Sequence, residues 1–150
     1  MDSSTALDRQ GLVVLDPDTC RRLLDLSPVG RVAYVHAGEP MILPVNHLRD
    51  GHGVVFRSAT GSTLDAASRR EPMAFEVDGY DEKTMTGWSV LVRGRSDLVT
   101  DPDEVERLAA RDLHPWADGV DRPTWVRIGG TTVTGRRIAE WPSRGRTGGG

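Results

Sequence analysis

The chain has 150 residues, of which 37% are hydrophobic, and it carries a formal net charge of −3. This size suits one domain whose core needs no cross-links, and the charge gives no overall attraction to nucleic acid or to an anionic membrane. The single cysteine, Cys20, excludes an internal disulfide framework and a cysteine-based zinc site. No apolar run approaches about 18 residues, and the N-terminus lacks a signal-peptide pattern, so we expect a cytoplasmic protein without a membrane span.

Both ends of the chain are polar or glycine-rich and show no hydrophobic period. We therefore expect disorder over residues 1–10 and 143–150, and one domain over residues 11–142. A chain of this length needs no linker between domains, and it contains no internal repeat.

A short amphipathic helix is predicted first, in the stretch DPDTCRRLLDLSP. Asp16 or Asp18 is its N-cap, and it ends before Pro28. Cys20 lies on the apolar side of this helix, and no histidine or cluster of charge donors is near it in the sequence. These surroundings favour a buried small side chain over a reactive thiol.

Strand-like runs follow at short spacing, interrupted by two more helices. The strands are predicted over residues 29–36, 40–48, 53–58, 72–78, 87–100, 124–129 and 131–141. The helices begin at Ser62 or Thr63 and after Asp101. Asp50-Gly51 and Gly129-Gly130 are two-residue hairpin signals between adjacent runs. These elements predict a mainly β fold, a small closed or partly open barrel of antiparallel strands with short helices.

The faces of the strands differ in polarity. Trp88, Val90 and Val92 share one face of their strand, which is the expected core side, while the opposite face is more polar. The stretches AYV and MIL are apolar on both faces. In an antiparallel barrel this pattern indicates that a helix or a second subunit covers the outside, and it favours a dimer.

The stretch FRSATGSTLDAASRR, residues 56–70, places an arginine, several hydroxyl groups and a glycine between a strand and a helix. A helix N-terminus exposes unpaired N–H groups, so this turn could surround a phosphate. Alternatively, Ser62 caps the helix, Asp65 completes a capping box, and Arg57 is a solvated charge. The pattern alone leaves both interpretations open.

Several motifs in order resemble the pyridoxamine 5'-phosphate oxidase-like family of FMN-binding split-barrel proteins, especially its actinobacterial branch. They are the Pro-Val-Asn strand, the Phe-Arg-Ser stretch before a glycine and a helix, the Phe-Glu-Val-Asp strand and the Gly-Trp-Ser-Val strand. The similarity spans residues 16–141, closed by PWADG and VTGRRI. It implies a split β-barrel of about six antiparallel strands and a homodimer with two flavin sites at the subunit interface.

The resemblance also implies a set of cofactor-binding residues. The flavin ring would be lined by Pro44, Val45 and Asn46. The phosphate would be held by Arg57, Ser58, Gly61, Ser62 and Thr63, and the cofactor would also be reached by Trp88. Many relatives carry lysine where this chain has Thr63, so one positive charge of the phosphate site is missing. Trp88 has a second interpretation, as an ordinary core residue.

Other polar residues allow chemical and structural interpretations. Glu76 and Asp78 face the same way on their strand, and an ion pair with a neighbouring arginine is favoured over acid-base catalysis. His47 follows Asn46, so it could line a substrate pocket or, less favourably, ligate heme iron. No histidine pair has the spacing of a metal motif, and no metal site is predicted.

The leading hypothesis is an FMN-dependent oxidoreductase that transfers two electrons to or from an unidentified small molecule. No catalytic side chain is assigned. One alternative is a deazaflavin-dependent reductase, whose acidic cofactor tail would need basic residues such as Arg49, Arg93 or Arg95. The other is a non-catalytic protein that stores flavin or heme on the same fold.

Overall fold

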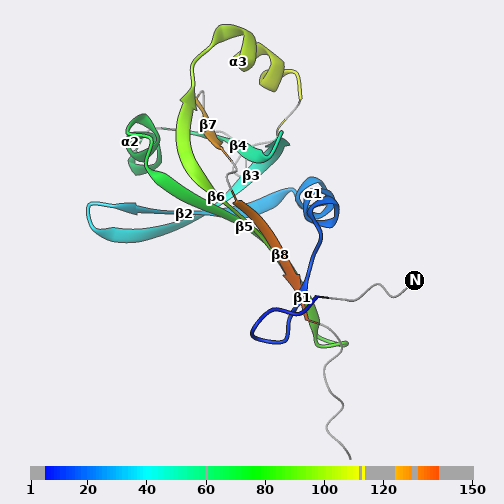
Figure 1. Ribbon diagram of the computed structural model, residues 1–150. Helices are drawn as coiled ribbons and strands as arrows, with labels where there is room; N and C mark the ends of the chain where they lie inside the picture. The colour runs from blue at the N-terminus through cyan, green and yellow to red at the C-terminus, as the bar shows by residue number, and fades with distance from the viewer. Residues whose placement is uncertain (1–5, 60, 112, 114–123, 130–131, 139–150) are drawn as a thin grey trace, which may run out of the picture.

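The computed structural model describes residues 6–59, 61–111, 113, 124–129 and 132–138 (Figure 1). The strands in these ranges are β1 Val13–Val14, β2 Val29–His36, β3 Glu39–Asp50, β4 Gly53–Ser58, β5 Pro72–Asp81, β6 Thr86–Val99, β7 Thr124–Ile128 and β8 Thr132–Arg137. The helices are α1 Pro17–Leu26, α2 Ser62–Ser68 and α3 Pro102–Ala109. All three predicted helices are therefore present in the part of the chain that the structure describes.

The strands form an antiparallel barrel. The order β6–β5–β2–β3–β4–β7 closes because β7 pairs again with β6, while β8 and β1 extend the sheet from β6. β3 pairs with β2 through its first part and with β4 through its last four residues. β6 likewise pairs with β8 and then with β7 (Figure 1). The predicted mainly β split barrel of about six antiparallel strands with short helices is confirmed.

Alternation of side chains along the strands fills the barrel. Its fully buried apolar side chains are Val32, Val54, Phe56, Phe75, Val77, Val90, Val92, Val126 and Ile128. The predicted core side of β6 is thus confirmed. A second core of Val55, Val99, Leu108 and Trp125 lies between α3 and the other face of the β4–β7 sheet. Cys20 on α1 is also buried in the main core, as predicted, and burial raises the pKa of its thiol.

One of the two predicted hairpins is wrong. The β3–β4 hairpin forms, with Asp50 opposite Gly53 and Gly51 in the left-handed region at φ 61°. β7 and β8, in contrast, do not pair with each other, because both run antiparallel to β6 along the same edge. Gly129 donates its N–H to the Arg95 carbonyl oxygen on β6. β7 and β8 therefore follow one another along β6 instead of forming a hairpin.

The start of the described chain is tied to β8. Asp8 lies in the N-terminal segment for which disorder is expected, and its carboxylate accepts hydrogen bonds from the N–H groups of Gln10 and Leu12. The same carboxylate is paired with Arg136 at 3.2 Å. Residues 1–5 and the predicted tail at 143–150 lie outside the described residues. None of the described helices is long and apolar enough to cross a membrane.

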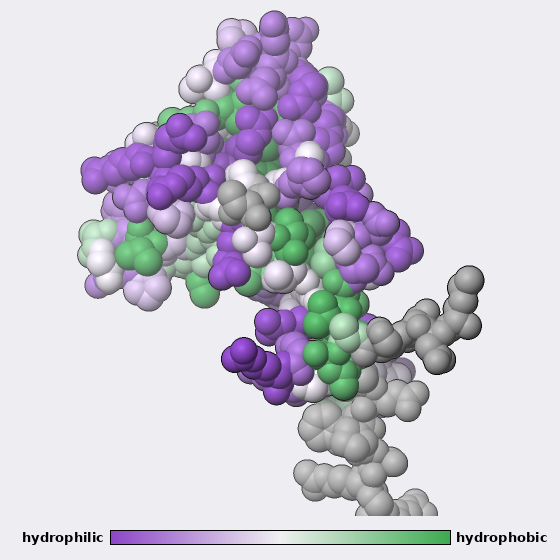
Figure 2. Space-filling model, in the orientation of Figure 1, coloured by the Kyte–Doolittle hydropathy of each residue, from purple (hydrophilic) through white to green (hydrophobic). Residues whose placement is uncertain are grey.

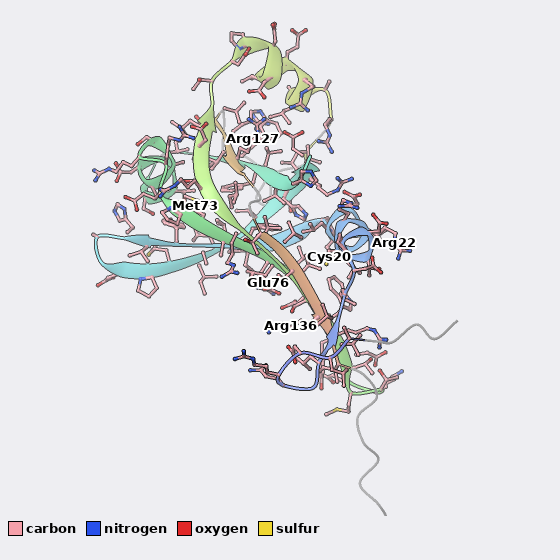
Figure 3. The ribbon with its side chains drawn as sticks, viewed as in Figure 1. Cys20, Arg22, Met73, Glu76, Arg127 and Arg136 are labelled. Carbon is pink, nitrogen blue, oxygen red and sulfur yellow. The ribbon has the colours of Figure 1, made fainter. Side chains whose placement is uncertain are left out.

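An ion-pair cluster joins the β3–β4 turn to α3 and β7. Asp50 accepts hydrogen bonds from Arg107 at 3.1 Å and from Arg127 at 3.0 Å, and Arg127 also donates to Glu104 at 3.0 Å (Figure 3). The Asp50 side chain is only 18% exposed. The hydrogen bond from Arg107 holds the pKa of Asp50 below its usual value, and Arg127 adds to this effect.

Asp50→Asn is expected to lower the free energy of unfolding by about 1–3 kcal/mol at neutral pH, because it weakens charge-assisted hydrogen bonds. The folded-state pKa of Asp50 is lowered, so its contribution is present above the ordinary value of 3.8 and is lost as the pH falls through the lowered pKa. Urea denaturation should show that the difference in the free energy of unfolding between wild type and variant becomes smaller in acid. Glu106→Gln, an exposed change on α3, should leave stability unchanged at every pH.

Candidate functional site

Asn46 and Arg57 lie where β3 leaves β4 to pair with β2. The β3–β4 ladder ends with His47 opposite Phe56, two side chains that point into the barrel core. Because side chains alternate along a strand, Asn46 and Arg57 face the opposite side of this sheet. Beyond the last pair of the ladder, Asn46 pairs with Val29 of β2 and Arg57 pairs with Trp125 of β7, so the two residues flank the split between the two sheets.

The Arg57 guanidinium has an aromatic support. Arg57 is directly opposite Trp125 on β7, and its guanidinium carbon lies 5.5 Å from the centre of the indole ring. This distance is within the range of a cation–π contact, which restrains the side chain without neutralising its charge. Ser58 follows Arg57 and is half-buried at the end of β4. The end of β4 therefore carries a guanidinium supported by an indole ring and, at the next position along the strand, a hydroxyl group.

The turn after β4 differs from the predicted capping arrangement. The N-cap of α2 is Gly61, at φ 122°, and no side chain caps the helix. Ser62 is the first helical residue, so the predicted Ser62 cap and the capping box with Asp65 are wrong. The Asp65 carboxylate instead lies 3.5 Å from Arg69 and 3.8 Å from His36.

Ser62 and Thr63 are instead joined through a tyrosine that the sequence analysis did not single out. The Tyr34 hydroxyl lies 2.6 Å from Ser62 Oγ and 3.0 Å from Thr63 Oγ1. Both Tyr34 and Thr63 are buried. This arrangement fixes two of the predicted phosphate-binding hydroxyls to β2. The only signal in the sequence is that Tyr34 occupies an inward position in an apolar strand.

The three residues predicted to line a flavin ring divide between the two faces of β3. Pro44 is exposed opposite Arg31, and Asn46 shares its face of the strand. Val45 lies opposite Gly30, points inward and packs against the main core. A ligand on the outside of β3 would therefore meet the side chains of Pro44 and Asn46 but only the backbone of Val45.

Trp88 lies apart from the other predicted residues. It lines a pocket of about 690 Å³ with Leu23 of α1, Tyr80 of β5 and Arg137 of β8. A Cβ atom on Gly79 would come within 2.6 Å of the Trp88 indole nitrogen, so the ring lies against the Gly79 backbone. None of the other eight predicted site residues lines this pocket. Within one chain, the structure does not bring Trp88 into the site at Arg57.

His47 is a structural residue, which corrects both of its predicted functional uses. It is 5% exposed, its Nε2 lies 2.9 Å from the Leu24 carbonyl oxygen, and its ring packs against Phe75 with centres 4.5 Å apart. It does not line the pocket beside Trp88. Burial lowers its pKa, and the hydrogen bond to Leu24 partly opposes this effect.

His47 should make the protein less stable in mild acid. The unfolded state takes up a proton near the ordinary pKa of 6.5, whereas the buried ring does so only at lower pH, so stability is lost as the pH falls below that value. Urea denaturation should show that wild type exceeds His47→Gln in the free energy of unfolding by more at about pH 7.5 than at about pH 5.5. His52→Gln, in an exposed turn, serves as the control variant measured at the same two pH values.

The predicted ion pair of the β5 carboxylates is confirmed. Arg31 on β2 lies 3.6 Å from Glu76 and 3.4 Å from Asp78. Burial raises the pKa of Glu76 to about 7, with a further contribution from the adjacent Asp78 carboxyl group. Glu76 therefore holds a proton over part of the physiological pH range.

A groove of about 1350 Å³ lies near the β2–β3 hairpin. Its lining includes Tyr34, Ile42, Arg93 and Arg95. Two of the three arginines considered for an acidic cofactor tail thus line the groove. Arg49 does not, because it pairs with Asp25 at 2.8 Å on the α1 side of the barrel.

This closed antiparallel barrel, in which β3 and β6 each pass from one sheet to the other, defines a split-barrel protein. The family described as pyridoxamine 5'-phosphate oxidase matches residues 16–137. The chain belongs to this family.

Individual relatives are consistent with the family assignment. The chain is 39% identical over 132 residues to the uncharacterized protein Rv0080 of Mycobacterium tuberculosis, covering 85% of this chain and 86% of the relative. The structure of the FAD binding protein from Mycobacterium smegmatis superposes with a TM-score of 0.69 at 31% identity, over 83% of this chain and 97% of that one. An FAD-binding protein from Mesorhizobium loti, at 20% identity and a TM-score of 0.71 over 85% and 99% of the chains, shares the fold.

Proposed function

We propose that the protein is a flavin-dependent oxidoreductase that binds FMN at the interface of a homodimer. The observation that carries this proposal is the position of Arg57, which directly follows the β3–β4 ladder and lies opposite Trp125, a few residues before the Ser62 and Thr63 hydroxyls at the start of α2. A guanidinium and several hydroxyls suit a phosphate monoester, and an amide suits the polar edge of a flavin ring.

The residues would divide the work as follows. Arg57 and Ser58 hold the phosphate, and Gly61 allows the backbone to approach it. Pro44 and Asn46 contact the ring from β3. Thr63 supplies no charge where many relatives have lysine. Its hydroxyl contacts Tyr34, which also contacts Ser62, so Thr63 helps to position the Ser62 hydroxyl. The bound flavin supplies two-electron chemistry toward a small molecule, while these residues position it and exclude water.

The surface outside the barrel supports a second subunit. Val35 is 58% exposed and Ile42 is 67% exposed on neighbouring outward positions of the β2–β3 hairpin. Figure 2 shows hydrophobic surface where this hairpin projects. An exposed apolar sheet face of this kind is typical of a protein interface. We infer that a second copy covers it and contributes its own Trp88 to the site.

An adenine dinucleotide flavin is the second candidate. The Mycobacterium smegmatis relative is an FAD binding protein. The groove also offers a volume of about 1350 Å³ and the side chains of Arg93 and Arg95 for a longer anionic cofactor. A deazaflavin with an acidic tail would use the same arginines.

The test is the absorbance spectrum and mass of any cofactor that co-purifies, followed by titration with FMN, FAD and a deazaflavin under identical conditions. FMN should bind most tightly, and a nicotinamide donor should bleach its absorbance. If FAD or the deazaflavin bound more tightly, that compound would be assigned as the cofactor in place of FMN. A bound flavin that no donor reduces would indicate storage, and a protein that binds none of the three would contradict the proposal.

A further inference from the structure

We propose that pairing of two chains is coupled to proton uptake by the Glu76–Asp78 carboxyl pair, so that the homodimer is tighter in mild acid than in mild base. This inference rests on the homodimer of the proposed function. It adds a means by which pH would control completion of the shared cofactor site.

Both acids of the carboxyl pair lie within ion-pair distance of the same cation, Arg31. Glu76 and Asp78 project from the same face of β5, and Arg31 on β2 is opposite Glu76 in the strand register. One Arg31 nitrogen lies 3.6 Å from the Glu76 carboxylate and 3.4 Å from that of Asp78. With both acids ionised, this group of three carries a net charge of about −1; with one proton bound, it is neutral.

The neighbouring strands bring few other charges to this face. On β6, Leu91 is opposite Glu76 and Ser89 is opposite Asp78. On β8, Thr134 is opposite Leu91, and Arg136 is opposite Ser89.

Two arginines and a proline complete the surroundings of the carboxyl pair. Arg136 is paired with Asp8 at 3.2 Å. Arg93, opposite Ala74, shares the outward face one step beyond Leu91. On β3, Pro44 is opposite Arg31. Figure 3 shows Glu76 near the middle of the ribbon and Arg136 on β8 below it.

The carboxyl pair shares its surface with the exposed apolar side chains of the β2–β3 hairpin. Ala33 and Ala74 link the two regions, since they are opposite each other next to the Arg31–Glu76 pair. A two-fold dimer presents the same patch from both subunits, so a second copy on this face would bury two such groups. Burying a net charge is costly, whereas burying a neutral, hydrogen-bonded group is much less so.

The protonation of Glu76 sets the pH range over which dimerisation changes and determines that the dimer is tighter at lower pH. Its pKa is raised to about 7 by burial, and the Asp78 carboxyl group adds to the shift. Covering the face removes more water and raises the pKa of Glu76 further, so the dimer binds more protons than two separate chains. The dissociation constant of the dimer should therefore rise as the pH increases through about 7.

Sedimentation velocity on the full chain, without added flavin, tests this coupling. From about pH 6 to about pH 8.5, the wild-type dimer should weaken at least about tenfold. Glu76→Gln removes one of the two carboxyl groups and leaves Asp78 alone with Arg31, so this dimer should remain stable at both pH values. Glu106→Gln, an exposed change on α3, should keep the wild-type pH dependence. Asp78→Asn provides a second neutralising variant if Glu76→Gln does not fold.

The outcomes separate the coupling from the proposed function. A wild-type dimer of constant strength, or a Glu76→Gln dimer that weakens as the wild type does, would overturn the coupling and leave the flavin site intact. A chain that stays monomeric in every variant and at every pH would overturn both the coupling and the shared site. Flavin titration of the same samples shows whether cofactor binding survives on its own.

Discussion

Arg57→Ala should raise the dissociation constant for FMN about 100-fold and lower the free energy of unfolding by less than about 1 kcal/mol. The loss of affinity corresponds to removing charge-assisted hydrogen bonds to a phosphate. The contact with Trp125, at 5.5 Å from the ring centre, is a cation–π contact of a half-buried arginine, and such contacts contribute about 0.5–1 kcal/mol. Fluorescence titration and urea denaturation of the same preparation measure the two quantities.

Arg22→Ala is the matched control for this change. Arg22 lies on the exposed side of α1 and donates to Thr19 at 3.2 Å (Figure 3). Its removal should alter neither flavin affinity nor stability appreciably. If Arg57→Ala lost affinity only in proportion to a loss of folded protein, Arg57 would be a structural residue and the phosphate assignment would fail.

Gly30→Val should lower the free energy of unfolding by about 3 kcal/mol or more. A Cβ atom at Gly30 would lie 2.6 Å from Phe75 Cε2 and 2.8 Å from the Glu76 carbonyl oxygen. The first contact is with a fully buried ring and the second is with the backbone of the paired strand, so neither neighbour can move without disturbing the barrel core. Urea denaturation measures the loss.

Gly129→Ala provides the comparison for Gly30. The nearest atom to a Cβ there is 3.8 Å away, and its φ lies outside the left-handed region. Its stability should stay within about 0.5 kcal/mol of wild type. A Gly30→Val protein as stable as Gly129→Ala would show that the β2–β5 packing tolerates expansion, contrary to the close contacts seen here.

The elements of this fold could be predicted because their patterns are local. The period of two in β6 identifies the buried side of Val90 and Val92, and Asp16 caps α1 by accepting from the Thr19 N–H at 2.7 Å. The hairpin predicted at Gly129-Gly130 was wrong because two adjacent glycines are compatible with a chain that reverses and with one that continues. Only pairing with β6 decides between the two, and that contact is remote in sequence.

The candidate site could be predicted only in part, for a similar reason. The sequence predicts Arg57 and Ser62 as site residues from a strand-to-helix turn rich in polar groups. Tyr34, which holds the hydroxyls of that turn, lies 28 residues from Ser62 in an apolar strand and has no distinguishing pattern. His47 looked functional because it follows Asn46, yet alternation along β3 directs it into the core, where Leu24 accepts its hydrogen bond.

In the proposed homodimer, each flavin site combines Arg57 of one chain with Trp88 of the other. Separate Arg57→Ala and Trp88→Ala proteins should each bind FMN poorly. When the two are unfolded and refolded together, every mixed dimer should regain one intact site, because both wild-type residues then meet at the same site. Flavin binding should recover to about one quarter of the wild-type sites, as random pairing makes half of the dimers mixed. No recovery, with mixed dimers demonstrated by differently tagged chains, would contradict the account.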